Sequence, residues 1–322
     1  MFTTDMKPDN LEYRKVVIQH IKELQKFGYT GFEFPIAPGN NKNYAKDIDD
    51  YAALRGAMDV AGLSEIKITT NVGATRTFDP SSAYPQQRKE ALDYLRSRVD
   101  ITAALRGKIM MGPIVLPYGV FPTTDFNEPI WSDQLQTALI PRYANAQSIL
   151  NELGQYAESK NVKLAIEPIT HWETPGPNKL SQLINLLEGV ANKQVGVVID
   201  SAHETLDGDG PEIFKQQVDA LFQQERLHYI QVSPPDRGAL HTSWLPWQAF
   251  LQPILPVYQG PIAVEIFNAI PAFINSLRLT RRKFWIPGED GSNAYPSAYD
   301  IAHKAIVATR EELEKMLCQS QN

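Results

Sequence analysis

The chain has 322 residues, 43% hydrophobic and 21% charged, and its net charge of −6 without a basic stripe disfavours a nucleic-acid partner. Its single cysteine, Cys318, excludes both a disulfide framework and a cysteine-based zinc site within one chain. No apolar run reaches membrane length and no signal-peptide core opens the chain, so we expect a cytoplasmic protein with no membrane partner.

Short apolar segments and longer amphipathic segments alternate along the chain. The opening Met1–Met6 is a weak first strand at best, and clearer strands are predicted at 31–36, 66–72, 109–116, 162–166, 195–199, 226–232 and 261–264. Helices are predicted at 11–27, 44–61, 82–105, 132–160, 180–191, 210–224, 246–251 and 297–317. Pro141 should kink or restart the helix that contains it.

About eight strand–helix units follow one another without a composition break or a long linker. Such alternation requires a parallel sheet with helical crossovers, and eight units close naturally into a barrel. A doubly wound open sheet is the alternative, but no GxGxxG motif follows an early strand. We therefore predict an α/β fold, a single (β/α)8 TIM barrel spanning 1–322, with an insertion at about 269–296 between the last strand and the last helix.

Three of the predicted strands end in a carboxylate: Glu167, Asp200 and Glu265. Successive residues of a strand face opposite ways, so Gln231 lies near the end of its own strand on the face opposite His228. Because parallel strands of a barrel finish at one end, all four side chains can converge there. Three carboxylates and a carboxamide form a hard, all-oxygen set that suits Mn²⁺ or Mg²⁺. Without a cation the carboxylates would repel, and at least one would tend to keep its proton.

These residues resemble the xylose-isomerase-like barrels, and within them the ketose 3-epimerases of the tagatose and psicose epimerase type. In that family the ends of the last four strands carry Glu, Asp, His and Glu as metal ligands, and the first two lie 33 residues apart, as Glu167 and Asp200 do. Gln231 stands where the family has its metal-binding His, and a neutral carboxamide is a weaker donor than imidazole toward transition metals. His241, in the following loop, is an alternative donor if the loop folds back. The family's substrate-contacting positions match Glu173, His203 and Arg237.

The resemblance implies a metal-dependent isomerase or epimerase acting on a small sugar. Glu167 and Glu265 would ligate the metal and exchange a proton with the carbon beside the carbonyl, one on each face, through an enediolate. A single base that returns the proton to the neighbouring carbon would instead interconvert aldose and ketose. Glu173, His203 and Arg237 would hold sugar hydroxyls.

Two other functions stay open at this stage. One is a barrel that binds a sugar without turnover, having lost its metal through the change at Gln231. The other is a metal-dependent phosphodiesterase of the endonuclease IV type, which needs several His ligands and a basic surface and is disfavoured by six His and a negative charge. The insertion, with Arg278, Arg281 and Arg282, is either a lid, a subunit contact in a homo-oligomer or a solvated surface helix.

Plain structural roles are also open for individual residues. Glu173 is a candidate solvated loop charge, and His203 is a candidate cap for the helix that begins near Gly210. Arg237 has the alternative of pairing with Asp236 or Glu265. His171 and Trp172 serve either as loop packing or as a sugar-stacking wall.

Overall fold

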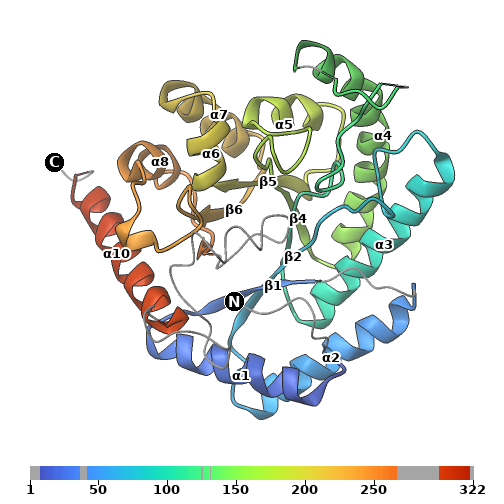
Figure 1. Cartoon of the computed structure of the whole chain (residues 1–322). Helices are drawn as coiled ribbons and strands as arrows, with labels where there is room; N and C mark the ends of the chain where they lie inside the picture. The colour runs from blue at the N-terminus through green and yellow to red at the C-terminus, as the bar shows by residue number, and fades with distance from the viewer. Residues whose placement is uncertain (1–7, 37–41, 125, 131, 267–296, 320–322) are drawn as a thin grey trace.

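The protein was analysed as a computed structural model that describes residues 8–36, 42–124, 126–130, 132–266 and 297–319. Within these ranges seven parallel strands pair in chain order, and helices surround them (Figure 1). The strands are β1 (Gly31–Pro35), β2 (Lys67–Asn71), β3 (Ile109–Gly112), β4 (Lys163–Ile166), β5 (Val195–Asp200), β6 (Leu227–Val232) and β7 (Ile262–Val264). The predicted TIM-barrel fold is confirmed. The weak first strand at 1–6 and the insertion at about 269–296 lie outside the described residues, so the single-domain boundary stays a prediction.

The helices occupy the predicted places between the strands. They are α1 (Leu11–Lys26), α2 (Tyr44–Val60), α3 (Pro85–Ala104), α4 (Ser132–Ser159), α5 (Leu180–Leu187), α6 (Ser201–Asp207), α7 (Pro211–Gln223), α8 (Trp247–Ile254) and α10 (Ala298–Gln319), with a 3₁₀ turn η1 (Leu240–Thr242). Helix α4 continues through Pro141, so a restart there is wrong, and a kink at Pro141 stays a prediction. Among the described helices, none has the length and apolar character needed to cross a membrane.

Helix α6 and the turn η1 were not predicted. Helix α6 begins directly after β5, and Asp200, the last residue of β5, caps it by accepting a hydrogen bond from Ala202 N at Oδ1 (3.0 Å). The cap fixes one oxygen of this carboxylate and leaves Oδ2 to face elsewhere. A strand-end residue thus serves both the local fold and the end of the barrel.

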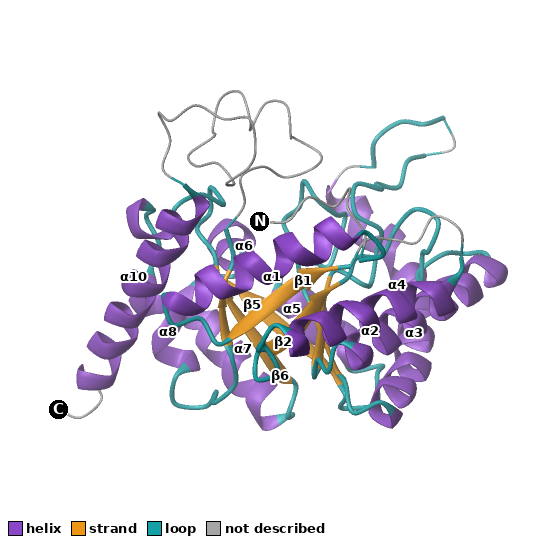
Figure 2. Ribbon diagram, turned by 90° about the horizontal axis from the view of Figure 1, so that it is seen from below, coloured by secondary structure: helices purple, strands orange, loops and turns teal. Residues whose placement is uncertain are grey.

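Two packed layers hold the barrel together. The larger core lies between strands and helices and contains fully buried side chains such as Val17, Leu54, Leu95 and Leu150. A second, smaller cluster comprises Ile109, Met111, Ala165, Val198 and Tyr229, with Ala263 against it. Because this cluster joins alternate residues of β3 to β7, it fills the inside of the curved sheet. Figure 2 shows the strands enclosed by helices, seen from below the view of Figure 1.

Gly112 at the end of β3 requires a backbone that other residues rarely adopt. Its φ is 128°, and an added Cβ would overlap the carbonyl oxygen of Val72. The Gly112 carbonyl accepts hydrogen bonds from Glu167 N (3.1 Å) and Ile114 N (3.0 Å), so this close approach also positions Glu167.

Replacing Gly112 by Ala is expected to lower the free energy of unfolding by about 2 kcal/mol, because the added Cβ meets backbone that has no room to move. Urea denaturation followed by circular dichroism measures the change. Gly56→Ala is the matched control, since Gly56 lies inside α2 with nothing within 4 Å of an added Cβ. This control should leave stability unchanged or raise it slightly. A Gly112→Ala protein that unfolds at the wild-type urea concentration would contradict the expectation.

Candidate active site

Four side chains stand one layer beyond the interior cluster, at the end of the barrel where the strands finish. Counting two residues along each strand from Ala165, Val198, Tyr229 and Ala263 leads to Glu167, Asp200, Gln231 and Glu265, which therefore face the same way. Backbone hydrogen bonds from Glu167 N to Gly112 O (3.1 Å) and from Glu265 N to Val232 O (2.9 Å) extend β4 and β7 to these residues. We call this end of the barrel the mouth.

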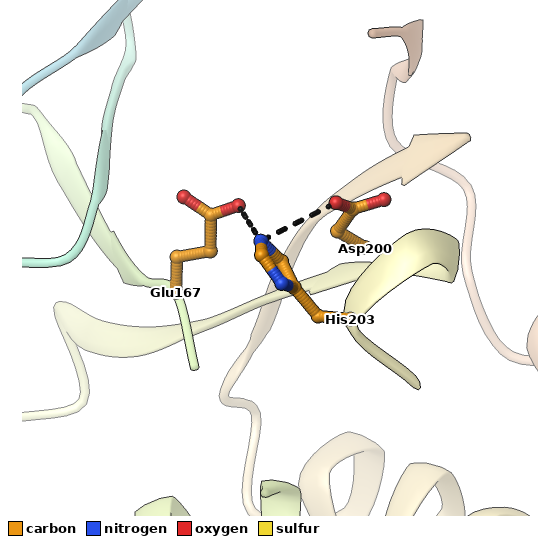
Figure 3. A group of neighbouring side chains, drawn as sticks. All are labelled: Glu167, Asp200 and His203. Atoms are coloured by element: carbon orange, nitrogen blue, oxygen red, sulfur yellow. Dashed lines mark ion pairs between the residues drawn. The ribbon is translucent and has the colours of Figure 1, made fainter. Parts of the chain in front are cut away.

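Helix α6 carries His203 to the carboxylates (Figure 3). Its Nε2 lies 3.2 Å from Glu167 Oε1 and 3.6 Å from Asp200 Oδ2. One ligand atom from each of these residues lies within 4.8 Å of the others, so the three can surround a metal ion. His203 therefore does not cap the helix that begins near Gly210, but sits in the first turn of α6 inside the mouth.

The backbone around Thr170 decides how His203 can act. Thr170 N donates a hydrogen bond to His203 Nδ1 at 3.1 Å, so Nδ1 must keep its lone pair. A neutral imidazole has one N–H, which then lies on Nε2 and points at Glu167. His203 is thus set up as a hydrogen-bond donor, and ligation of a metal through Nε2 would require the Thr170 bond to break.

Gln231 is fully buried, and its two amide atoms have different surroundings. Nε2 donates to Glu33 Oε2 at 3.0 Å and to Glu265 Oε1 at 3.2 Å. Oε1 is buried and has no hydrogen-bond partner within the described residues. Leaving a buried acceptor without a donor costs about 1–3 kcal/mol, and a carboxamide oxygen is a good ligand for a hard cation. The donor set of Glu167, Asp200, Gln231 and Glu265 therefore fits a divalent metal ion.

Glu33 is a mouth residue that the sequence interpretation missed. It lies on β1 and accepts hydrogen bonds from Asn71 Nδ2 (3.0 Å) and Gln231 Nε2, which connects the first strands to the sixth across the barrel. A charged residue between Phe32 and Phe34 in an otherwise apolar strand was the available signal.

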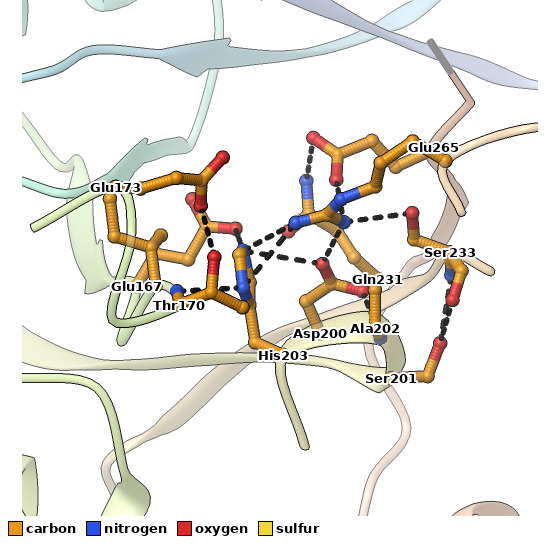
Figure 4. Close-up of polar contacts among 12 residues, drawn as sticks. Glu167, Thr170, Glu173, Asp200, Ser201, Ala202, His203, Gln231, Ser233 and Glu265 are labelled. Carbon is orange, nitrogen blue, oxygen red and sulfur yellow. Dashed lines mark hydrogen bonds and ion pairs between the residues drawn. The ribbon is translucent and has the colours of Figure 1, made fainter. Parts of the chain in front are cut away.

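Arg237 contacts two of the mouth carboxylates, Asp200 and Glu265, which Figure 4 shows together with Gln231 and His203. Its Nη1 lies 2.5 Å from Asp200 Oδ2 and 3.1 Å from Glu265 Oε2, and it donates to Ser233 Oγ at 2.9 Å. The pairing with Glu265, left open as an alternative role, is present, and Asp236 accepts hydrogen bonds from Gly238 N and Ser243 Oγ. Arg237 is 7% exposed and, within the part of the chain that the structure describes, brings a positive charge to Asp200 and Glu265.

Glu173 is buried beside the same group, so its interpretation as a solvated loop charge is wrong. Its Oε2 accepts a hydrogen bond from Thr170 Oγ1 at 2.9 Å. Burial raises the pKa of Glu173, and the nearby His203 and Arg237 partly oppose the shift. Glu173 thus lines the mouth from the loop after β4.

The other histidines do not reach the mouth. His171 is exposed and pairs with Asp207 at 2.6 Å, with Trp172 edge-on against its ring. His228 is buried on the other face of β6, near the carbonyls of Leu164 and Glu225, as the alternation predicted. His241 is exposed on η1, which packs on α10, so the alternative of His241 folding back as a metal donor is wrong.

Electrostatic crowding shapes the protonation of the mouth. Burial raises the pKa of Glu33 to about 7, partly opposed by the hydrogen bond from Asn71. Burial also holds the pKa of Glu265 well above its usual range; Arg237 lowers it, and Asp200, Glu167 and Glu33 raise it further. Both shifts favour the protonated form of these carboxyls when no metal ion is bound, in the direction expected for converging acids.

Comparison with known proteins places this geometry in a family. The sequence profile described as "Xylose isomerase-like TIM barrel" matches residues 21–283. The L-ribulose 3-epimerase of Methylomonas sp. (strain DH-1) is 22% identical over 245 residues, 75% of this chain and 76% of its own. The ketose 3-epimerase of Arthrobacter globiformis is 21% identical over 253 residues, 77% of each chain.

A crystal structure from Anabaena variabilis ATCC 29413, provisionally described as a sugar phosphate isomerase/epimerase, is 75% identical to this chain. It superposes with a TM-score of 0.94 and covers 98% of this chain and 96% of its own. The resemblance predicted from the residues at the strand ends is confirmed by the profile, which extends over most of the chain. The chain belongs to the xylose isomerase-like TIM-barrel family.

Proposed function

We propose that the protein is a metal-dependent sugar isomerase or epimerase that transfers a proton at the carbon beside a ketose carbonyl. The observation that carries the proposal is the meeting of Glu167, Asp200, Gln231 and Glu265 at the mouth, with His203 and Arg237 between them. The named relatives are all described as isomerases or epimerases, which supports an enzyme of this class.

The proposed metal ligands are Glu167, Asp200, Gln231 and Glu265. They offer only oxygen atoms, which favours Mn²⁺ or Mg²⁺, and the Oε1 of Gln231, which has no hydrogen-bond partner among the described residues, is the proposed donor in place of the imidazole that the resemblance implies. When bound, the ion would polarise the carbonyl and hydroxyl oxygens of the sugar and make the neighbouring C–H more acidic.

Glu167 and Glu265 are the proposed proton carriers. They directly follow β4 and β7, on either side of Asp200 and Gln231 in the strand order, so a sugar carbon between them would present one face to each carboxylate. One carboxylate would remove the proton beside the carbonyl, and the other would return a proton from the opposite face, inverting that centre. Return by the same residue to the neighbouring carbon would give isomerisation instead.

Glu173, His203 and Arg237 are the proposed sugar-binding groups. The Nε2–H of His203 and the guanidinium of Arg237 supply donors, and Glu173 supplies an acceptor, all from buried positions. Buried polar groups of this kind select a hydroxylated ligand, because a ligand without matching groups would leave them unpaired. Among the described residues the mouth contains only one histidine, which argues against a multinuclear zinc phosphodiesterase.

The test combines metal binding with proton exchange. Titration calorimetry with Mn²⁺ should show one ion per chain in the wild type and no binding after Glu167→Ala or Glu265→Ala, whereas Glu188→Ala, an exposed control on the outside, should bind normally. The loaded wild type, offered free and phosphorylated ketoses in D₂O, should incorporate deuterium beside the carbonyl of at least one. Tight sugar binding without metal or exchange would favour the alternative of a non-catalytic sugar-binding barrel.

Gln231→Leu separates the role of the carboxamide oxygen from the shape of the side chain. The variant is expected to weaken Mn²⁺ binding at least about tenfold, corresponding to about 1.4 kcal/mol, because a ligand oxygen is lost from an otherwise unchanged set. Calorimetry on the metal-free protein measures the affinity. Unchanged affinity in Gln231→Leu would exclude Gln231 as a ligand and point to His203, which lies in the same group with Glu167 and Asp200.

A further inference from the structure

Arg237 engages the same oxygen atoms that the proposed metal ion needs. Asp200 Oδ1 caps α6 through Ala202 N at 3.0 Å, so Oδ2 is the oxygen left to face the mouth, and Arg237 Nη1 lies 2.5 Å from it. Glu265 Oε1 accepts from Gln231 Nε2 at 3.2 Å, and Oε2 accepts from the same Nη1 at 3.1 Å. The guanidinium therefore bridges two of the four proposed ligands.

A metal ion and this guanidinium cannot occupy the mouth together at low energy. A divalent ion binds carboxylate oxygen at about 2.0–2.6 Å, so an ion shared by Asp200 and Glu265 would lie within a few ångströms of the guanidinium charge. Like charges this close repel strongly in a buried site, where water does not screen them. Binding of the ion requires Arg237 to move away.

The contact between Arg237 and His203 indicates that the guanidinium is not at its best position. Arg237 Nη2 lies 2.7 Å from His203 Nε2, and a guanidinium has only donors to offer. Thr170 N already uses the lone pair of Nδ1, so Nε2 carries its own hydrogen and two donors face each other. The attraction of Asp200 and Glu265 holds Arg237 in place against this unfavourable contact.

We infer that Arg237 is a built-in counter-ion of the mouth that the metal ion displaces. In the metal-free protein its guanidinium neutralises the crowded carboxylates, and metal binding releases it toward the sugar. The side chain starts from a turn after β6, where Arg237 has a φ of 55° and its N–H donates to Pro234 O at 2.7 Å. The inference rests on the proposed function, since it concerns the proposed metal ligands.

Metal affinity tests the inference without any measurement of activity. Arg237→Ala and Arg237→Gln are prepared in metal-free form and titrated with Mn²⁺, and Gln keeps a side chain able to hydrogen-bond Ser233 if the Ala variant folds poorly. Both variants should bind Mn²⁺ at least about tenfold more tightly than the wild type, because the ion no longer competes with a buried ion pair. Arg142→Gln, which removes a charge paired with Asp79 and leaves the four proposed ligands unchanged, should bind as the wild type does.

Added guanidinium distinguishes direct competition from a general effect of removing a positive charge. Millimolar guanidinium chloride, far below denaturing concentrations, should weaken Mn²⁺ binding to Arg237→Ala and leave the wild type unaffected relative to equal NaCl. Mn²⁺ affinity that is unchanged or weaker in both variants would overturn the inference, as would an absence of guanidinium competition. Glu167→Ala is also introduced into the wild type and into Arg237→Ala. If it abolishes Mn²⁺ binding in both, the proposed metal site stands even if guanidinium does not compete. If Mn²⁺ still binds after Glu167→Ala, the proposed metal site is overturned as well.

Discussion

Glu167→Gln and Glu265→Gln should each stop the interconversion of two epimeric ketoses and yet retain proton exchange with one of them. Glutamine keeps a carbonyl oxygen that can ligate a metal ion, so at saturating Mn²⁺ the main loss is the ability to carry a proton. The turnover number should fall by about 10³-fold or more, since removing a positioned acid–base group costs about 10²–10⁴-fold and both half-reactions are needed. Each variant should still exchange the epimer whose proton faces the remaining carboxylate.

The measurement is proton NMR in D₂O, started separately from each epimer of whichever ketose the wild type accepts. If the two carboxylates act on opposite faces of the sugar, the two variants should prefer opposite epimers. Glu167→Gln should exchange the proton of one epimer for deuterium, and Glu265→Gln should exchange the proton of the other. Glu188→Gln, an exposed carboxamide replacement outside the mouth, should retain wild-type turnover. Exchange from the same epimer in both variants, or full turnover in either, would show that a single base operates and would favour aldose–ketose isomerisation.

The strands of the barrel could be predicted because they are short apolar or β-branched runs, and β4 to β7 also carry a carboxylate or an amide at or next to their ends. Val195–Asp200 is buried at every position, and its last residue is a charge that only a site or a cap explains. The alternation of inward and outward residues then predicted that Gln231 and not His228 would face the mouth, and the structure agrees. The alternation of residues along each strand and the polar residues at the strand ends together predicted the main part of the fold and the four strand-end residues.

Helix α6 and Glu33 could not be found in the same way. Helix α6 has seven residues, too few for a periodic pattern, and its start depends on an Asp200 cap that also ends a strand. Glu33 is a single carboxylate in β1, and only the three-dimensional closure of the sheet brings it to Gln231. Short sequence patterns predict helices and strands, whereas contacts across the barrel depend on how the sheet curves and cannot be predicted from such patterns.

The pairing of charges in the mouth was the feature that the sequence predicted least well. The resemblance to the ketose 3-epimerases implied that Arg237 binds sugar, but the path of the turn from Ser233 to Gly238 decides which carboxylates it meets. In the structure one guanidinium contacts Asp200, Glu265 and His203 together. The sequence contains the donors and acceptors, and the backbone of that loop determines their pairing.

The metal-free protein is expected to lose stability as the pH rises from about 5 to about 8, by about 3 kcal/mol, because each unit of pKa shift is worth about 1.4 kcal/mol. The ordinary pKa of a Glu is 4.5, and burial raises the pKa of Glu33 to about 7. Below pH 4.5 both folded and unfolded states hold this proton and the contribution to stability is complete. Between pH 4.5 and about 7 only the folded state holds the proton on Glu33. Raising the pH through the folded-state pKa therefore removes the stability that this proton contributes. Glu265, also raised, acts in the same direction.

Urea denaturation of metal-free protein across this pH range measures the effect, with Glu33→Gln as the key variant and Glu188→Gln as the control. Glu33→Gln should show a flatter dependence, because a side chain that cannot ionise has no proton to lose, while Glu188→Gln should follow the wild type. Saturating Mn²⁺ should reverse the trend, since metal binding to ionised carboxylates strengthens as their protons leave. A wild type whose metal-free stability rises over this range, or a Glu33→Gln protein with an unchanged slope, would mean that burial does not hold a proton on Glu33.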